Sequence, residues 1–496
     1  MPARTEAEIA VVGGGTAGAA LAARLAAAGR DVLVIEAGPD YGPRVAGRWP
    51  ADLLDAGSLP TSHDWGYRTT SAGGGDLVLD RARVLGGCSA HNGCSQNWGW
   101  RGDYDAWGQR SPGWSAAELE PAFGRARSAL RLRHYAADEI QPFQAAFLEA
   151  CAAAGHRLAD DFDDLDGGAG AGCAPVNIAD GMRWNTAFAY LDPVRDRLRI
   201  LDRTEVERIA PESGGPTRIQ VRSPAGPVEI HAAETVLCGG AYGTPELLLR
   251  SGIGDPRALA RAGTAVRHEL AGVGRGLQEH PAIELEFEAG AELAARLADF
   301  ARGRWLPEEQ AILKLASPRC DGPYDLHVYP WIEPDAAAPH TWKCVFPVAL
   351  VTPRSRGAVE PGGAGGRARI DHRYLSDPSD VAALAHGIAA VLEILAHPPL
   401  ADLLGSPRTV LPQDDAGALE QFIRGHHAHY WHPGASCPMG PDPGRGAVVD
   451  EHARLHGMPS IRVADASIFP AIPRGTTAMP TTVVGERVAE LMAAAG

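Results

Sequence analysis

Near the start of the chain, a short apolar run is followed by a helix-length apolar stretch and then by a second short apolar run. The first run covers Ile9 to Val12, the alanine-rich stretch continues to about Ala28, and the second run covers Asp31 to Ile35. Short apolar runs bounded by turn residues predict buried strands, and the longer stretch between them predicts a helix. The opening residues therefore predict a βαβ unit of a parallel sheet.

Glycines at the turn between the first predicted strand and the helix give this unit a chemical character. Gly13, Gly15 and Gly18 form the pattern G-x-G-x-x-G, in which backbone amides and the positive end of the helix can face a pyrophosphate. Glu36 ends the second strand about 20 residues later, where a carboxylate can bind a ribose diol. The unit predicts a dinucleotide site, and by itself it fits NAD and FAD equally.

Composition narrows the class of protein. A length of 496 residues exceeds what one hydrophobic core usually supports, so two domains are expected. A formal net charge of −15 argues against nucleic acid, whose binding depends on Lys and Arg. The eight cysteines form no CxxC pair, so we expect no metal site and no disulfide framework. No apolar stretch indicates a membrane span or a signal region, and a cytoplasmic location is expected.

Four further stretches resemble, in order and spacing, the glucose-methanol-choline (GMC) family of FAD-dependent oxidoreductases. They are RARVLGGCSAHNGCSQNWGWRGDYDAW (81–107), CGGAYGTPELLLRSGIG followed by LAGVGRGLQEHP (238–254 and 270–281), YWHPGASCPMG (430–440) and IRVADASIFPAIPRGTTAMPTTVVGERVAELM (461–492). Because these stretches cover nearly the whole chain, it is identified as a member of this family, similar to its choline-oxidase-like branch. The resemblance implies FAD as the cofactor.

The resemblance also implies an α/β fold. It consists of a doubly wound, Rossmann-like FAD-binding domain built from discontinuous segments and a substrate-binding cap domain on an antiparallel sheet. We expect residues 1–140, 186–283 and 430–496 in the FAD-binding domain, and residues 141–185 and 284–429 in the cap. The alternation of apolar and acidic residues in 282–290, AIELEFEAG, predicts a strand that leaves the FAD-binding domain.

Several residues beyond the glycine turn are expected to contact FAD because of the resemblance. It implies contacts with the flavin, adenine and pyrophosphate parts of the cofactor from Gly86, Gly87, His91, Asn92, Val206 and Asp465. In the choline-oxidase-like branch, a histidine at the place of His91 is joined covalently to the flavin. His91 is therefore a candidate for covalent attachment, and the alternative is that it only hydrogen-bonds within the turn.

The resemblance places the catalytic base at His432. A histidine that titrates near neutrality suits the removal of a hydroxyl proton while hydride leaves the carbon for flavin N5. The family normally supplies a second histidine or asparagine near the C-terminus, and this place falls to Ala478. Either Thr476 or Thr477 could substitute with a hydroxyl, and His327 in the cap is another candidate partner.

The substrate pocket is expected to contain Trp431, next to the base, together with His327, Thr476, Thr477 and Ala478. Choline enzymes of the branch carry a glutamate for the trimethylammonium group where this chain has Ala282, so choline is disfavoured. The leading prediction is oxidation of a primary or secondary alcohol to the carbonyl, with electrons passed to oxygen or another acceptor. The alternatives are an FAD-containing lyase of the hydroxynitrile type and a non-catalytic flavoprotein.

Overall fold

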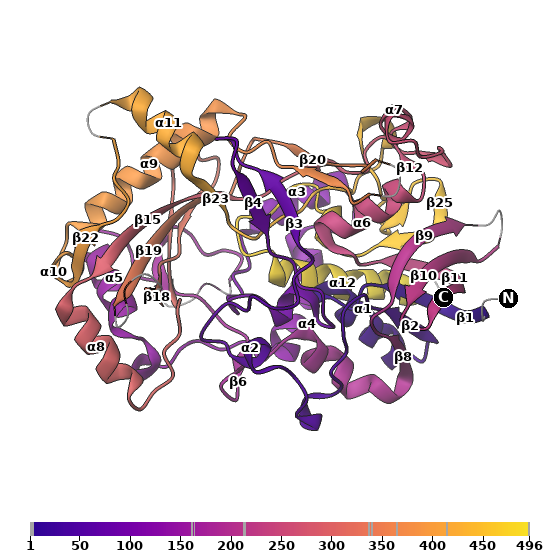
Figure 1. The fold of residues 1–496 in the computed structure, drawn as a ribbon, viewed down its shortest axis with the longest axis horizontal. Helices are drawn as coiled ribbons and strands as arrows, with labels where there is room; N and C mark the ends of the chain where they lie inside the picture. The colour runs from indigo at the N-terminus through magenta and orange to yellow at the C-terminus, as the bar shows by residue number, and fades with distance from the viewer. Residues whose placement is uncertain are drawn as a thin grey trace.

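Two large sheets organise the protein. The computed structural model describes residues 4–494 apart from 160, 161, 163, 212–214, 336, 337, 339, 340, 364, 365, 413 and 414. One sheet is largely parallel, the other is antiparallel, and each contains eight of the described strands. Figure 1 shows them at opposite ends of the molecule, with the parallel sheet on the right and the antiparallel sheet on the left.

The largely parallel sheet has the strand order β24-β25-β11-β1-β2-β8, with β10 and β9 paired beyond β11. Its strands are β1 (Arg4–Val12), β2 (Val32–Ile35), β8 (Leu198–Leu201), β9 (Glu205–Pro211), β10 (Thr217–Ser223), β11 (Gly226–Leu237), β24 (Arg454–Leu455) and β25 (Met458–Val463). The predicted βαβ unit is present as β1, α1 (Thr16–Ala27) and β2. The first strand begins before the predicted Ile9, because its polar first half pairs with β11 in parallel register.

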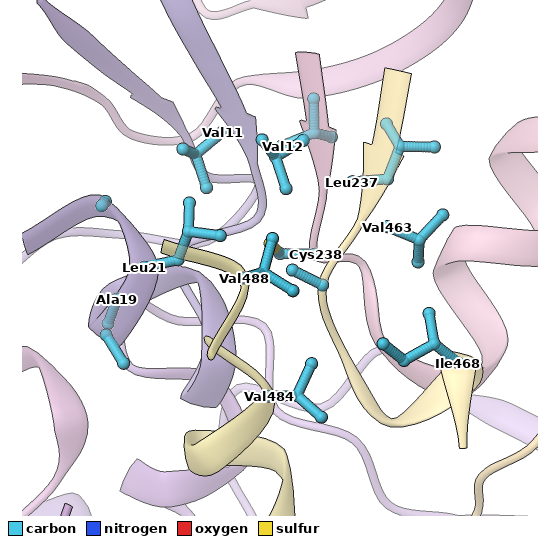
Figure 2. Packing of buried hydrophobic residues seen from close by; sticks show 14 of the residues in the cluster. Val11, Val12, Ala19, Leu21, Leu237, Cys238, Val463, Ile468, Val484 and Val488 are labelled. Atoms are coloured by element: carbon cyan, nitrogen blue, oxygen red, sulfur yellow. The ribbon is translucent and has the colours of Figure 1, made fainter. Parts of the chain in front are cut away.

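Helices cover the face of this sheet that lies next to the glycine turn between β1 and α1. Figure 2 shows Leu21 of α1 with Val484 and Val488 of α12 (Ala478–Ala494), facing Val12 of β1 and Leu237 of β11. The other α-helices in the segments expected to form the FAD-binding domain are α2 (Ala51–Leu54), α3 (Arg101–Arg110), α4 (Ala116–Ala129), α6 (Gly240–Arg250) and α7 (Pro256–Arg261). This apolar packing fixes the start of α1 against the end of β1.

The antiparallel sheet has the order β22-β15-β19-β17-β16-β5, with β18 paired to β19 and β23 paired to β15. Its strands are β5 (Gly170–Cys173), β15 (Pro281–Ala289), β16 (Ala311–Leu315), β17 (Leu326–Val328), β18 (Trp331–Pro334), β19 (Trp342–Leu350), β22 (Leu404–Pro407) and β23 (His427–His429). On β15, the side chains of Ile283 and Leu285 pack in the cap core, and Glu284 between them faces the opposite side of the strand.

The helices of the cap are α5 (Pro142–Ala153), α8 (Ala291–Ala301), α9 (Pro378–Leu395), α10 (Leu400–Leu403) and α11 (Ala416–His426). The sequence prediction of no apolar stretch as long as a membrane span is wrong for α9, which has 18 residues and a mean hydropathy of 1.4. Half of this helix is buried in the protein, and it packs against β19 and α11. That arrangement is typical of a core helix, and the cytoplasmic location stays a prediction.

Four smaller sheets accompany the two large ones among the described residues. In one of them, β14 (Arg275–Leu277) pairs with β20 (Gly357–Glu360), which pairs with β21 (Arg369–Asp371). This sheet combines a strand expected in the FAD-binding domain with two expected in the cap, and the domain boundaries stay a prediction. The two-stranded pairs are β3 (Tyr67–Thr70) with β4 (Asp76–Leu79), β6 (Ile178–Ala179) with β7 (Met182–Arg183), and β12 (Ile253–Gly254) with β13 (His268–Glu269).

Candidate active site

A cavity of about 740 Å³ lies between the two large sheets. At one end it is lined by the glycine turn after β1, and at the other end by residues of β15, β18 and β19 of the cap. His432 and Trp431 also line it. The cavity therefore connects the predicted dinucleotide site with the predicted base.

The dinucleotide end is built by close backbone packing. Gly13 has a φ of +101°, and a Cβ at Gly18 would lie 2.0 Å from the Gly13 carbonyl oxygen, so only glycine lets α1 start this close to β1. Gly13 and Gly15 line the cavity, whereas Gly18 acts through this packing. Glu36 lines the cavity too and accepts hydrogen bonds from the Gly14 and Gly38 amides at 2.9 and 2.7 Å.

The pair Gly86 and Gly87 brings a second loop against this turn. Both residues have positive φ, +93° and +53°, and a Cβ at Gly87 would lie 2.7 Å from the Cα of Gly15. Gly87 lines the cavity, and the loop continues into His91 and Asn92, which line it as well. The sequence-predicted cofactor residues of the two segments are thus brought together.

The His91 imidazole is held by a hydrogen bond to the backbone. Its Nε2 lies 2.7 Å from the carbonyl oxygen of Ser62. Because a carbonyl only accepts, Nε2 carries the hydrogen and Nδ1 keeps its lone pair. Burial lowers the pKa of this imidazole, which favours the neutral form. The backbone carbonyl of the neighbouring Asn92 accepts a hydrogen bond from Arg183 Nε at 2.7 Å, which fixes the loop.

Val206 on β9 and Asp465 after β25 also line the cavity. The Asp465 carboxylate accepts hydrogen bonds from the Gly240 amide at 2.8 Å, the Thr244 hydroxyl at 2.6 Å and the Ser467 amide at 2.8 Å. Burial nonetheless raises the pKa of this carboxyl above its usual range. The side chain of Asp465 therefore ties the start of α6 to the end of the parallel sheet.

His432 lines the opposite side of the cavity and is half-buried. Its Nδ1 lies 3.0 Å from Nδ1 of His280, and its backbone amide donates to Glu279 Oε1 at 2.7 Å. Burial lowers the pKa of His432 well below its usual range, and the neighbouring His280 acts in the same direction. His432 therefore does not titrate near neutrality as expected from the sequence, because burial keeps it neutral; the neutral imidazole is the form that can accept a proton.

Sequence reasoning missed the pair that supports His432. Glu279 Oε1 accepts the amides of both His280 and His432, at 2.8 and 2.7 Å. Burial raises the pKa of Glu279 to about 8 and lowers that of His280 to about 3. The signal was present in QEHP, where a glutamate and a histidine precede the proline, but nothing in the sequence shows that this segment meets residues 430–433.

Some of the predicted substrate-pocket residues line the cavity, and one does not. Thr476, Thr477 and Ala478 line the cavity at the start of α12. The Thr476 hydroxyl bonds the backbone of residues 95–97, whereas the Thr477 hydroxyl has no hydrogen-bond partner among the described residues. His327 on β17 is 1% exposed, stacks on Tyr324 and is not among the described residues that line the cavity. The structure thus separates His327 from the other predicted pocket residues.

The cap side of the cavity carries an acidic wall that sequence reasoning also missed. We define it as the four glutamates that line the cavity from three cap segments, Glu284, Glu308, Glu309 and Glu333. Burial raises the pKa of Glu284 and Glu308 to about 7 and that of Glu309 to about 8. Lys343 also lines this side and contacts Glu333 at 2.6 Å.

A cavity with a dinucleotide turn at one end and a neutral histidine at the other is typical of an oxidoreductase that holds its cofactor and substrate together. The glycine cradle and the carboxylate of Glu36 fit FAD, because they leave backbone amides and a ribose acceptor along one wall of an extended cavity. The class defined by fold and site is a two-domain flavin oxidoreductase.

The chain belongs to the GMC oxidoreductase family. The family's N-terminal model matches residues 7–282 and its C-terminal model matches residues 353–485. The chain is 30% identical over 532 residues to a protein named oxygen-dependent choline dehydrogenase from Brucella canis. The match covers 98% of this chain and 95% of that protein. An uncharacterized GMC-type oxidoreductase from Mycobacterium tuberculosis is also 30% identical, with 98% and 99% covered.

Solved structures of the family share the fold. Pyridoxine 4-oxidase from Mesorbium loti superposes with a TM-score of 0.85 at 28% identity, covering 98% of each chain. A variant of formate oxidase from Aspergillus oryzae RIB40 reaches a TM-score of 0.85 at 21% identity, covering 99% of this chain and 98% of that one. The predicted family, fold class and FAD cofactor are confirmed, and the protein is an FAD-dependent oxidoreductase.

Proposed function

We propose that the protein oxidises a primary or secondary alcohol to the carbonyl, with His432 as the base that takes the hydroxyl proton. When bound, FAD supplies the acceptor for the hydride. The observation that carries the proposal is the contact of 3.0 Å between Nδ1 of His432 and Nδ1 of His280. Since two lone pairs do not bond, one of these nitrogens carries a hydrogen and the other accepts it.

The tautomer of His280 decides which nitrogen donates. The backbone carbonyls of Val351 and Pro473 act on this ring and raise its pKa, although burial dominates and leaves the ring neutral. Nε2 of His280 is buried without a hydrogen-bond partner among the described residues, and we assign the ring hydrogen to it because a base at His432 needs an acceptor at its Nδ1. His280 Nδ1 then accepts, and His432 Nδ1 donates. His432 keeps its lone pair on Nε2, which has no hydrogen-bond partner among the described residues and is available to a substrate hydroxyl.

The departure at Ala478 leaves the substrate oxygen with fewer partners than in the family pattern. Ala478 offers only a methyl group, but the Thr477 hydroxyl beside it lines the same cavity without a bond to a described residue. Thr476 is committed to the backbone of 95–97 and is the poorer substitute. We therefore assign the second hydrogen bond to the substrate oxygen to Thr477.

The test is anaerobic titration of the purified flavoprotein with alcohols of several classes, including sugars, aminosugars, aryl alcohols and polyols. An alcohol substrate bleaches the flavin absorbance, and readmitted air restores it if oxygen is the electron acceptor. Replacing the base, His432→Asn, should slow bleaching by about 10² to 10⁴. His426→Asn is the matched control, because His426 is an exposed histidine six residues before His432.

The outcomes separate the alternatives. Bleaching by an alcohol that requires His432 supports alcohol oxidation. A loaded flavin that stays yellow throughout the panel contradicts it, and release of cyanide from a cyanohydrin would then favour a hydroxynitrile-type lyase. If neither reaction occurs, a non-catalytic flavoprotein becomes the better description.

A further inference from the structure

The acidic wall lacks an internal counter-charge around Glu309. Arg183 is the nearby cation that acts on this carboxyl, but its donors bond the backbone carbonyls of Asn92, Leu53 and Ser58 at 2.7 to 3.0 Å. Lys343 contacts Glu333 and Glu286, at 2.6 and 3.3 Å. Within the described residues, no ion pair or hydrogen bond reaches the Glu309 carboxylate. The Glu309 carboxyl is therefore left for something outside the protein to satisfy.

The Glu309 carboxylate lies over the cofactor loop. A Cβ at Gly93 would lie 2.0 Å from Glu309 Oε1, and Gly93 lines the cavity two residues after His91. A residue larger than glycine at this position would displace the carboxylate. The absence of a side chain at position 93 thus lets Glu309 reach from the cap to the loop expected beside the flavin.

Two buried hydroxyls face the same place without partners. Tyr329 is 6% exposed and Tyr430 is 5% exposed, both line the cavity, and neither phenol has a hydrogen-bond partner among the described residues. Burial raises the pKa of both phenols well above its usual range, and the charge of Glu309 acts in the same direction. Buried hydroxyls that lack a partner carry an energetic cost unless a ligand completes them. They are independent of the acidic residues and point to a ligand.

This cluster adjoins the base. The Tyr430 and His432 rings pack edge to face with their centroids 5.0 Å apart. Trp331 and Trp431 add aromatic faces to the cavity lining, with centroids 6.5 Å apart. Aromatic rings beside carboxylates are the surroundings that a protonated amine prefers, because both attract its positive charge.

We propose that Glu309, with Glu308 beside it and the hydroxyls of Tyr329 and Tyr430, forms a subsite for a protonated primary or secondary amine carried by the alcohol substrate. The assignment to a substrate rests on the proposed alcohol oxidation. The carboxylates are hydrogen-bond acceptors, and a phenol oxygen can accept as well as donate, so together they favour a cation that has N–H donors. A quaternary ammonium group satisfies the charge but donates no hydrogen bond.

Binding tests the subsite without turnover. Isothermal titration of the flavin-loaded protein at pH 8.5 would compare benzylammonium, benzyltrimethylammonium and benzyl methyl ether, none of which has a hydroxyl to oxidise. We expect benzylammonium to bind at least tenfold more tightly than the other two. Equal affinity for benzylammonium and the neutral ether, or no binding of either, overturns the proposal.

Two variants and a control locate the effect. Glu309→Gln removes the charge, and Gly93→Ala displaces the carboxylate but leaves its charge. Each substitution should weaken the binding of benzylammonium at least tenfold. Glu288→Gln is the matched control, because Glu288 is exposed on the same strand as Glu284. It is not among the described residues that line the cavity. Flavin content and thermal stability identify a variant that fails to fold. Unchanged affinity in a folded Glu309→Gln protein contradicts the assignment.

The pH dependence adds a readout that a merely structural role would not move. Burial and Glu308 raise the pKa of Glu309 to about 8, and Arg183 opposes them. The carboxyl is charged above this pH, so affinity for benzylammonium should rise roughly tenfold from pH 6.5 to 7.5 in the wild type. In Glu309→Gln it should rise at most about threefold, because only the neighbouring Glu308, whose pKa is about 7, still titrates in this window. Failure of this binding test leaves alcohol oxidation standing, and failure of flavin bleaching leaves the binding test valid.

Discussion

The hydrogen bond between the two imidazoles makes a prediction about His280, which lies behind the base. His280→Leu keeps a buried apolar side chain of similar size but removes the acceptor for His432 Nδ1–H. A buried donor left without a partner costs about 1–3 kcal/mol. If that cost falls on the orientation and tautomer of the base, the rate of flavin bleaching drops by about 5- to 150-fold at 1.36 kcal/mol per decade.

The assay is stopped-flow flavin reduction without oxygen, using an alcohol that bleaches the wild-type flavin. His280→Gln is the conservative variant, because its carbonyl oxygen can accept the same hydrogen bond, and we expect it to recover part of the rate. With a pKa of about 3, His280 stays neutral in the working range, so its loss should not remove a titration from the wild-type pH profile.

Two results would refute this reasoning. One is a His280→Leu protein, with normal flavin content, that reduces its flavin at the wild-type rate. The other is an equal loss in the Leu and Gln variants, since an effect that ignores the acceptor comes from packing and not from the hydrogen bond. Either result would also contradict the assignment of the lone pair to Nε2 of His432.

Three further changes have definite expected outcomes. Gly18→Ala brings a Cβ to 2.0 Å from the Gly13 carbonyl oxygen, so the purified protein should lose most of its visible flavin absorbance. If His91 carries a covalent bond to FAD, acid-precipitated wild type stays yellow, whereas His91→Asn releases the colour into the supernatant; a colourless wild-type precipitate would contradict the bond. The Glu486 side chain is fully buried beneath Arg24 and Arg125, which are 41% and 33% exposed. Glu486→Ala should lower the free energy of unfolding by about 2 kcal/mol in urea titration, less than for a fully buried pair because both arginines reach water.

Local patterns predicted the parts of the fold that depend on neighbours in sequence. The turn at Gly13 to Gly18 and the carboxylate of Glu36 were readable because a βαβ unit places them through one strand and one helix. The base position at His432 was predicted from resemblance, and the structure shows the geometry around it. The extent of β1 was predicted less well, because its first residues pair with β11, more than two hundred positions away.

Residues assembled from distant segments could not be predicted from local pattern. The acidic wall combines Glu284 on β15, Glu308 and Glu309 before β16, and Glu333 on β18. Each glutamate alone resembles an ordinary surface residue, and only the sheet pairing and the cavity make them neighbours. His327 failed to reach the cavity for the converse reason, because its strand presents it to the interior beside Tyr324.

One short segment links the base to the substrate selection that we propose. Glu279 and His280 hold His432, and β15 starts at the next residue, Pro281. Ala282 is buried, while Glu284, two residues further on the same face of the strand, lines the cavity. A carboxylate therefore lies on this face two residues beyond Ala282, further from the segment that fixes the base. Because Glu309 comes from a separate loop, the charge and shape of the cap wall can change while the hydrogen bond that orients His432 stays in place.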